Sequence, residues 1–535
     1  MSANRMTRRD ALAAGALGFA GLCAGCGRSS SSGGRPGSTL MRALADPDGD
    51  GLLASAPGVS LLDRTDLVGG VAGSSGRGRA LATFAQLTDT HVRDAQSPAR
   101  VAFLDRLGPR FGSAFRPHEA LTAQLLAGAV ASIDAARPDA VLVSGDIVDS
   151  AQRNELGWAL ALLAGGSVRP DSGRRGYEGV QAASSPDPLF YRPDLDAPRH
   201  PGLLARAVTP VRCAGLRAPW YPALGNHDVL VQGAIAPTAA TRAVATGTRM
   251  VVAPDRELLE LGRGGRLSRS QIDALLQAGL PGRSVRVSPD ADRVQLAADD
   301  VVARLRRAAR GRADGAGSHL DYAFTVGDAI QVIVLDLVRR DEGAEGLVTA
   351  ETVSFLRDAL REAGDRWIVV CCHQPLHESE GAAAALALLD ADPRVLAVVA
   401  GHRHRNVIVP RRSSAGGYWL ITTASLIDFP QQWRALRVVE TGRGAVALET
   451  WLVDHPGRPN DPGDLAGIAR DLAFLDAQGG RPAGAAGRRR DRNVRLHLPA
   501  RERRAPRRQR PNARPPATAA PRSGGSPGLG DNFGG

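Results

Sequence analysis

Five short motifs in this sequence bring histidine together with carboxylate or amide side chains. They are Thr88-Asp89-Thr90-His91, Gly145-Asp146-Ile147-Val148-Asp149, Gly225-Asn226-His227-Asp228, the single residue His373, and Gly401-His402-Arg403-His404. Together they hold five of the eleven histidines of the chain. Imidazole and carboxylate donors without a thiolate favour Mn, Fe or Zn over Ca²⁺. The motifs therefore predict a site for such divalent metal ions.

Seven side chains of these motifs could be metal ligands: Asp89, His91, Asp146, Asn226, His373, His402 and His404. One ion needs fewer donors, so the number predicts two ions. Asp89 and His91 stand two positions apart on an expected extended segment, so their side chains would point the same way, and the same holds for His402 and His404. We expect Asp146 to bridge the two ions.

Two divalent ions with Asp89, Asp146 and a hydroxide would leave a net positive charge, which suits a phosphate. Ions about 3.5–4 Å apart can activate a hydroxide at neutral pH and clamp the attacking and leaving oxygens. Hydrolysis of a phosphate ester is the reaction that this arrangement serves. His227 is not needed as a ligand and would face the leaving group as a proton donor. Asp228 would hold the His227 ring and favour its charged form.

The expected strands and helices would bring these motifs together. Apolar, β-branched runs predict strands at 81–87, 140–144, 220–224, 329–335, 367–372, 395–400, 418–422 and 446–452. Helical periodicity predicts helices at 103–107, 121–135, 353–363 and 382–389. This alternation favours an α/β fold with mixed sheets, interrupted by two long insertions at about 165–218 and 232–318. Each motif follows a strand, and ligands of open α/β sheets bind at the carboxyl ends of strands.

The order of the motifs resembles the calcineurin-like metallophosphoesterase superfamily, from about residue 82 to 454. The resemblance implies an α/β/β/α sandwich and a dinuclear centre. One ion would take Asp89, His91, Asp146 and His404, and the other would take Asp146, Asn226, His373 and His402. The stretches 149–156 and 425–432 resemble an exported actinobacterial branch.

Departures from relatives bear on substrate binding. Many have arginine where this chain has Ser150, so we expect a phosphate-binding arginine from elsewhere, Arg403 or Arg153. Purple acid phosphatases have tyrosine at the position of Asp149, which disfavours iron–tyrosinate chemistry here. We expect His377 with Glu378, and Asp428 with Gln431, to line the substrate pocket.

The two ends of the chain differ from its body. Residues 1–40 are expected to be an export signal with a Ser/Gly tether, because Arg8-Arg9 precedes a short apolar run, as in a twin-arginine signal. Cys26 resembles the lipidated residue of a bacterial lipoprotein, which would anchor the protein to a membrane. Residues 41–480 would form the catalytic domain. We expect an exported protein, extracellular or associated with the cell envelope.

Residues 481–535 hold fourteen arginines and are expected to be a disordered Arg/Pro/Gly-rich tail. The chain has no lysine, and its formal net charge of +12 is concentrated at the two ends, which leaves −3 for residues 41–480. A body of this charge disfavours a long basic groove for nucleic acid.

These features predict a metal-dependent phosphohydrolase acting on phosphate mono- or diesters. One alternative is a non-catalytic, envelope-associated binding protein on the same scaffold, and another is a phosphodiesterase of cyclic nucleotides or nucleic acid. The presence of His227 favours catalysis over binding alone, because a binding scaffold has no need of a proton donor.

Overall fold

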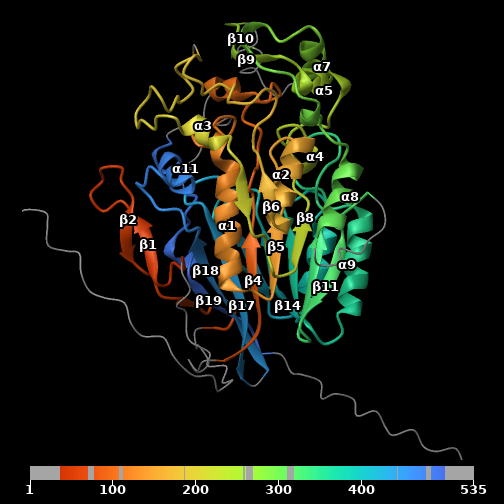
Figure 1. Ribbon diagram of the computed structural model, residues 1–535. Coiled ribbons are helices and arrows are strands. Elements are labelled where there is room, and N and C mark those ends of the chain that lie inside the picture. The colour runs from red at the N-terminus through yellow and green to blue at the C-terminus, as the bar shows by residue number, and fades with distance from the viewer. Residues whose placement is uncertain are drawn as a thin grey trace, which may run out of the picture.

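Two mixed β-sheets form the centre of the protein, and helices cover their outer faces (Figure 1). The computed structural model describes residues 37–69, 78–107, 112–185, 187–256, 260, 269–309, 318–442, 444–476 and 484–500. The predicted α/β/β/α sandwich with mixed central sheets is confirmed. No helix in these ranges is long and apolar enough to span a membrane.

The larger sheet has seven strands, in the order β3 (Leu62–Arg64), β19 (Val494–His497), β18 (Ala445–Asp454), β17 (Gln432–Gly442), β4 (Arg79–Leu87), β5 (Ala140–Ser144) and β8 (Trp220–Ala223). The neighbours β4, β5 and β8 are parallel to one another. Their carboxyl ends therefore meet at one edge of the sheet. The helices of this half are α1 (Thr122–Ala136), α2 (Arg153–Ala164) and α11 (Leu465–Leu475).

The second sheet has six strands, in the order β11 (Tyr322–Val326), β12 (Ile330–Leu335), β13 (Trp367–Cys372), β14 (Val395–Ala400), β16 (Tyr418–Thr422) and β15 (Val407–Arg411). Side chains of β13 alternate between its faces: Val369 and Cys371 join the core between the sheets. Ile368 and Val370 pack instead with α9 (Ala350–Glu362) and α10 (Ala383–Asp390). This two-sided burial explains why the strand is apolar throughout.

The predicted elements agree with the structure in most cases. All eight predicted strands are present within two residues of their expected bounds, and three of the four predicted helices correspond to α1, α9 and α10. The fourth predicted helix, at 103–107, is present as the short 3₁₀ helix η1 (Ala102–Leu107).

The two predicted insertions carry short elements of their own. The first contains β6 (Gly166–Val168), α3 (Leu203–Ala207) and β7 (Val211–Cys213). Helix α4 (Asn226–Val229) lies between the two insertions. The second contains α5 (Ala239–Thr246), β9 (Arg249–Pro254), α7 (Arg269–Gln277), β10 (Gly282–Arg286) and α8 (Ala298–Ala308). The hairpin β9–β10 and helices α5 and α7 gather at one end of the protein, at the top of Figure 1. A further hairpin pairs β1 (Arg42–Ala45) with β2 (Ala54–Pro57).

The predicted start of the disordered tail at 481 is wrong. Strand β19 lies between β18 and β3 in the larger sheet. Its side chains Val494 and Leu496, with the following Leu498, are buried. This alternation of apolar residues was the available signal, and the surrounding arginines obscured it. The rest of the predicted tail, 501–535, and the export signal with Cys26 lie outside the described residues.

Candidate metal centre

The five motifs lie directly after the carboxyl ends of β4, β5, β8, β13 and β14. Because β4, β5 and β8 are parallel, as are β13 and β14, the motifs of each sheet emerge from the same edge. The two sheets face each other, and their motifs meet in three groups of side chains that could hold a metal ion. One group combines His91, Asp149 and His227, and the other two, called the first and second cluster below, share Asp146.

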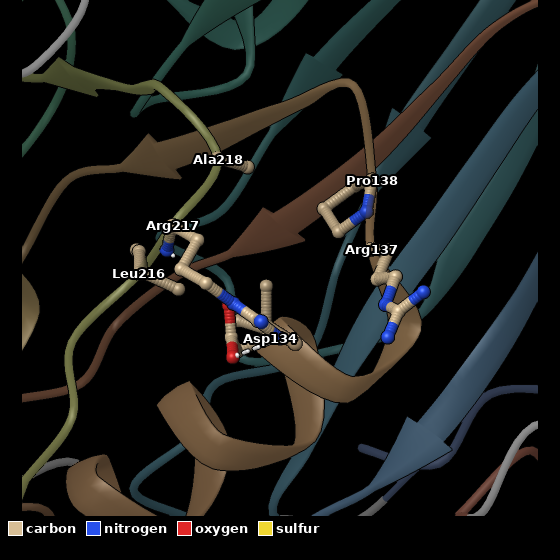
Figure 2. Close-up of a pocket in the computed structure, with 7 residues that line it drawn as sticks. Asp134, Arg137, Pro138, Leu216, Arg217 and Ala218 are labelled. Atoms are coloured by element: carbon tan, nitrogen blue, oxygen red, sulfur yellow. Dashed lines mark hydrogen bonds and ion pairs between the residues drawn. The ribbon is translucent and has the colours of Figure 1, made fainter.

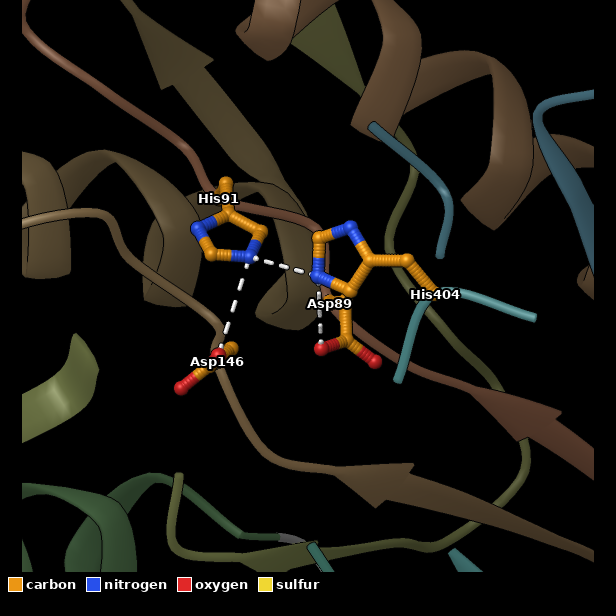
Figure 3. A group of neighbouring side chains, drawn as sticks. All are labelled: Asp89, His91, Asp146 and His404. Atoms are coloured by element: carbon orange, nitrogen blue, oxygen red, sulfur yellow. Dashed lines mark hydrogen bonds and ion pairs between the residues drawn. The ribbon is translucent and has the colours of Figure 1, made fainter. Parts of the chain in front are cut away.

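The first cluster combines Asp89, His91, Asp146 and His404, whose potential ligand atoms all lie within 4.8 Å of one another (Figure 3). Nε2 of His404 is 3.1 Å from Oδ1 of Asp89 and 3.3 Å from Nε2 of His91. Nε2 of His91 is 3.7 Å from Oδ2 of Asp146. Asp89, His91 and Asp146 are buried. This group offers two carboxylates and two imidazoles to a single point.

The second cluster combines Asp146, His373 and His402, again within 4.8 Å. Nε2 of His373 lies 3.1 Å from Oδ2 of Asp146 and, although buried, has no hydrogen-bond partner in the described structure. The His373 and His402 rings are 5.2 Å apart, centroid to centroid. Asp146 belongs to both clusters, in the position expected of a bridging carboxylate.

Asn226 is buried at the start of α4, beside Asp146. The next residue, His227, donates its backbone N–H to Oδ1 of Asp146 at 2.8 Å, which ties this turn to the bridging carboxylate. The Asn226 amide donates to the carbonyl of Gly233 at 3.0 Å. This bond fixes the amide so that Oδ1, which receives only a 3.5 Å contact from Gln374, remains the available acceptor.

Hydrogen bonds on the far side of the rings define which nitrogen faces the clusters. Nδ1 of His373 donates to the carbonyl of Ser144 at 2.8 Å, and Nδ1 of His91 donates to Asp149 Oδ1 at 3.1 Å. Nδ1 of His404 donates to Asp428. Each neutral ring therefore presents an unprotonated Nε2 to the clusters. These Nε2 lone pairs face one another and face carboxylates, so they repel unless a proton or a cation lies between them.

Asp149 and Asp428 each combine a histidine with buried arginine. Arg93 donates to Asp149 at 2.7 Å, and Arg100 also donates to it. Arg116 donates twice to Asp428. Although burial opposes ionisation, these arginines hold the pKa of both carboxyls well below its usual range. Both acids are therefore ionised and can orient the ligand rings.

The predicted role of Asp428 in lining the substrate pocket is therefore wrong. Its side chain is buried, and its oxygens accept hydrogen bonds from Arg116, His404 and Ser425. Gln431 is also buried, and its amide donates to backbone carbonyls. The loop after β16 thus supports the site from behind.

In the absence of cations, the carboxylates in and around the two clusters favour protonated histidines. Burial opposes protonation of His404 and His373, but the Asp89 and Asp428 carboxylates raise the pKa of His404 to about 10, and Asp146 with Asp89 raises that of His373 to about 9. In contrast, burial lowers the pKa of His91 to about 4 and that of His402 to about 3. Two protons thus stand in for cations among the carboxylates.

The backbone at the site differs from the expected extended segments. Asp89, His91, Asp146, His402 and His404 all have φ between 41° and 66°, a left-handed conformation that is rare for residues with a side chain. The expectation that alternation along an extended strand aligns Asp89 with His91 is wrong. The left-handed turns direct these side chains inward, and such strain of about 1–3 kcal/mol per residue persists where the surroundings enforce it.

His227 lies at the edge of the first cluster, with its ring 4.6 Å from that of His91 and its side chain 23% exposed. Nδ1 donates to the backbone carbonyl of Asp149 at 2.7 Å, so Nε2 is the atom free to reach a ligand. Oδ1 of Asp149 lies 3.9 Å from the same Nδ1.

The predicted contact of Asp228 with the His227 ring is wrong. Asp228 is buried and accepts hydrogen bonds from the backbone N–H groups of Ile147, Val148 and Gly225. It ties the loop that carries Asp146 to the loop that carries Asn226. Burial and the Asp146 charge raise its pKa to about 7. Asp228 is a positioning residue for both loops. The His227 ring, which Asp228 was predicted to hold, is held by the backbone carbonyl of Asp149.

Only some of the residues predicted to contact the substrate lie beside the clusters. Arg403 and His377 line a cavity of about 590 Å³ that also includes His402. Arg403 is already paired with Glu378 at 2.6 Å and Glu345 at 3.2 Å. The described contacts of the Arg153 side chain are with Asp292, at 3.5 Å, on the surface, and none of them joins it to the clusters.

A second cavity, of about 310 Å³, lies at the other end of α1, next to the starts of β5 and β8 (Figure 2). Arg217 donates to Asp134 across it at 2.9 Å. Its lining includes no residue of the clusters, and the charges of this pair compensate each other. It carries no evident chemistry.

The sequence analysis assigned no role to four residues that lie behind the ligand histidines: Asp149, Arg93, Arg100 and Arg116. Asp149 stood in a recognised motif, so its position was the available signal. The three arginines carried none, because arginine is frequent throughout this chain and their convergence depends on the loops between β4 and α1.

A scan against protein-family models finds no match, and a search of curated proteins finds none either. Solved structures that match include a dimetal phosphatase from Danio rerio, at 13% identity and a TM-score of 0.36, over 70% of this chain and 100% of that one. A purple acid phosphatase from yellow lupin (Lupinus luteus) seeds matches at 10% identity and 0.28, over 70% and 52%. PhoD matches at 13% identity and 0.28, over 75% and 78%. At such low scores, the function proposed below rests on the geometry of the site.

Proposed function

We propose that the protein is a metal-dependent hydrolase of phosphate mono- or diesters with a dinuclear centre. The observation that carries the proposal is Asp146, shared by two clusters into which His91, His373 and His404 all direct an Nε2 atom. The buried Nε2 of His373, without a hydrogen-bond partner among the described residues, is the kind of atom that a cation would satisfy.

The donor set fits two divalent cations. Asp89, His91, Asp146 and His404 would hold one, and Asp146, Asn226, His373 and His402 would hold the other. Nitrogen and oxygen donors favour Mn, Fe or Zn. When bound, such a pair neutralises the charge of a phosphate and activates water at neutral pH.

The chain's own groups would orient the ester and move the proton. Water adds its oxygen to phosphorus and releases a proton to the solvent, the P–O ester bond breaks, and the departing oxygen needs a proton. His227 would donate it from Nε2, while the backbone carbonyl of Asp149 holds Nδ1 and the Asp149 carboxylate lies 3.9 Å from the same nitrogen.

Purification with metal analysis, followed by assays of aryl phosphate monoesters and diesters with Mn, Fe, Zn and Mg, tests this function. Asp146→Asn is expected to abolish turnover and to lower the metal content, whereas His227→Ala should lower turnover, least for aryl esters with a stable leaving group, at an unchanged metal content. Wild-type rates in both variants would overturn the mechanism. A metal-loaded protein that binds phosphonates but hydrolyses no ester would instead favour the binding-protein alternative.

We also propose that the protein is exported, and that Cys26 is lipidated. The support is the Arg8-Arg9 pair before an apolar run and the sequence around Cys26. Fractionation of cells that make the Arg8→Lys/Arg9→Lys variant should find the precursor retained in the cytoplasm. Cys26→Ser should remove the protein from the detergent phase. Unchanged fractionation of both variants would contradict the proposal.

A further inference from the structure

A cavity of about 590 Å³ adjoins the second cluster, because His402 belongs to both. This volume falls within the range of small-molecule pockets, about 300–1,000 Å³. The loop after β14 and the strands β15 and β16 form most of its wall. A phosphate ester placed on the clusters would therefore have space for its organic group directly beside His402.

One cationic side chain of the cavity makes no ion pair within the described ranges. Arg403 is held by two carboxylates, those of Glu378 and Glu345. Arg405, two residues further along the same loop, is exposed, and it has no ion pair with any residue in the described part of the chain. It is the cationic group of this cavity that remains available to a ligand.

Another part of the cavity lining is apolar. Val407 and Val409 are 39% and 37% exposed, and they alternate along β15 with Ile408, which is buried in the core. Leu420, on the neighbouring β16, lines the same cavity. Large apolar side chains exposed next to one another on a strand are a wall on which an organic group can pack.

We propose that this cavity binds the organic group of the substrate and selects phosphate esters whose apolar organic group carries an anionic substituent, which Arg405 recognises. Val407 and Val409 contact the apolar part, and the arginine receives the anion. This inference rests on the proposed phosphohydrolase function, because the phosphate is held by the two clusters. It assigns Arg405 as a specificity residue.

Binding of two phosphonates to the Mn²⁺-loaded full chain tests the inference. Phenylphosphonate and 4-carboxyphenylphosphonate differ only in the added carboxylate, and calorimetry gives both dissociation constants. We expect the wild-type protein to bind the carboxylated compound about two- to fivefold more tightly, the effect of one charge pair at a partly exposed site. Arg405→Gln should bring this ratio to about one, and Arg405→Glu should reverse it.

Arg412→Gln is the matched control, because Arg412 is an exposed arginine just beyond β15 and outside the cavity lining. It should keep the wild-type ratio. The inference is overturned by an equal ratio in wild type and Arg405→Glu, by an equal loss in Arg412→Gln, or by failure of both phosphonates to bind.

The same experiment separates this inference from the proposed function. If the protein discriminates the phosphonates through Arg405 but hydrolyses no ester with any metal, the binding subsite stands and the hydrolase function fails. If it hydrolyses aryl phosphates but Arg405 does not affect the ratio, the hydrolase function stands and the subsite fails.

Discussion

The ring of His91 lies between the first cluster and Asp149, with Nδ1 3.1 Å from Oδ1 of that aspartate. On the other side of the carboxylate, the buried guanidinium of Arg93 donates to the same oxygen at 2.7 Å. The ion pair keeps Asp149 ionised, and the ionised carboxylate fixes the tautomer in which Nε2 of His91 is a bare lone pair. Asp149, which belongs to neither of the two clusters that share Asp146, thus determines that Nε2 of His91 is unprotonated.

Replacing Asp149 by asparagine should weaken metal binding about 10- to 100-fold, because the carboxylate no longer orients His91 or increases its basicity. The apparent Mn²⁺ dissociation constant, measured by chelator competition, checks this. Arg93→Gln is the matched control: it also breaks the buried ion pair but leaves the hydrogen bond between Asp149 and His91. Equal losses in both variants would mean that Asp149 is merely structural.

Asp428 should behave in the same way through His404. Asp428→Asn is expected to weaken Mn²⁺ binding by a similar factor, with Arg116→Gln as its control, since Arg116 holds the carboxylate without touching the ring. An Asp428→Asn protein that is folded, as judged by circular dichroism, and binds Mn²⁺ as tightly as wild type would contradict this role.

His227 should matter most when the leaving group needs a proton. We expect His227→Gln to lower kcat about 10²- to 10⁴-fold for an alkyl phosphate ester and far less for a p-nitrophenyl ester, whose leaving group is stable as an anion. The metal content should stay at the wild-type value. An equal loss for both esters would argue against proton donation and favour a role in binding.

Metal uptake should depend on pH. In the cation-free protein, the neighbouring carboxylates raise the pKa of His404 to about 10 and that of His373 to about 9 against the effect of burial. Both rings are therefore protonated at neutral pH, and cations must displace these protons. Affinity for Mn²⁺ should rise as pH increases from about 6 to 9.

Calorimetry in buffers of different ionisation enthalpy measures the protons released. We expect close to two per chain at pH 7 when both ions bind. Binding that is independent of pH and releases no proton would contradict the assignment of His373 and His404 as ligands.

The C-terminal strand should be essential for stability. Arg434 is buried in the larger sheet and donates to the backbone carbonyls of Asp491 and Arg492. A chain that ends at residue 483 loses both acceptors and β19, and its free energy of unfolding should fall by about 3 kcal/mol or more. A chain that ends at residue 500 is the control, and urea denaturation should give it the wild-type value.

The sequence predicts the core strands well for a physical reason. Strands such as β13 and β14 are buried on both faces, so every position is apolar and the run is easily recognised. Strand β17 was missed because Arg434 and Arg437 interrupt its pattern. The backbone carbonyls that accept from buried Arg434, those of Asp491 and Arg492, lie more than 50 residues away in the chain.

The site residues also differ in how well the sequence predicts them. Residues in the motifs could be recognised, because their chemistry is local in the sequence. The arginines behind them could not, since Arg93, Arg100 and Arg116 reach Asp149 and Asp428 only after the loops have folded. The misplaced role of Asp228 has the same origin: its neighbour in sequence is His227, but its partners in space are the N–H groups of Ile147, Val148 and Gly225.

The most direct test of the central claim is anomalous diffraction from crystals of the Mn²⁺-loaded protein, collected at the manganese absorption edge. We predict two peaks that flank the carboxylate of Asp146, one among Asp89, His91 and His404 and the other among Asn226, His373 and His402. A single peak, or two peaks that do not share Asp146, would contradict a dinuclear centre bridged by this residue.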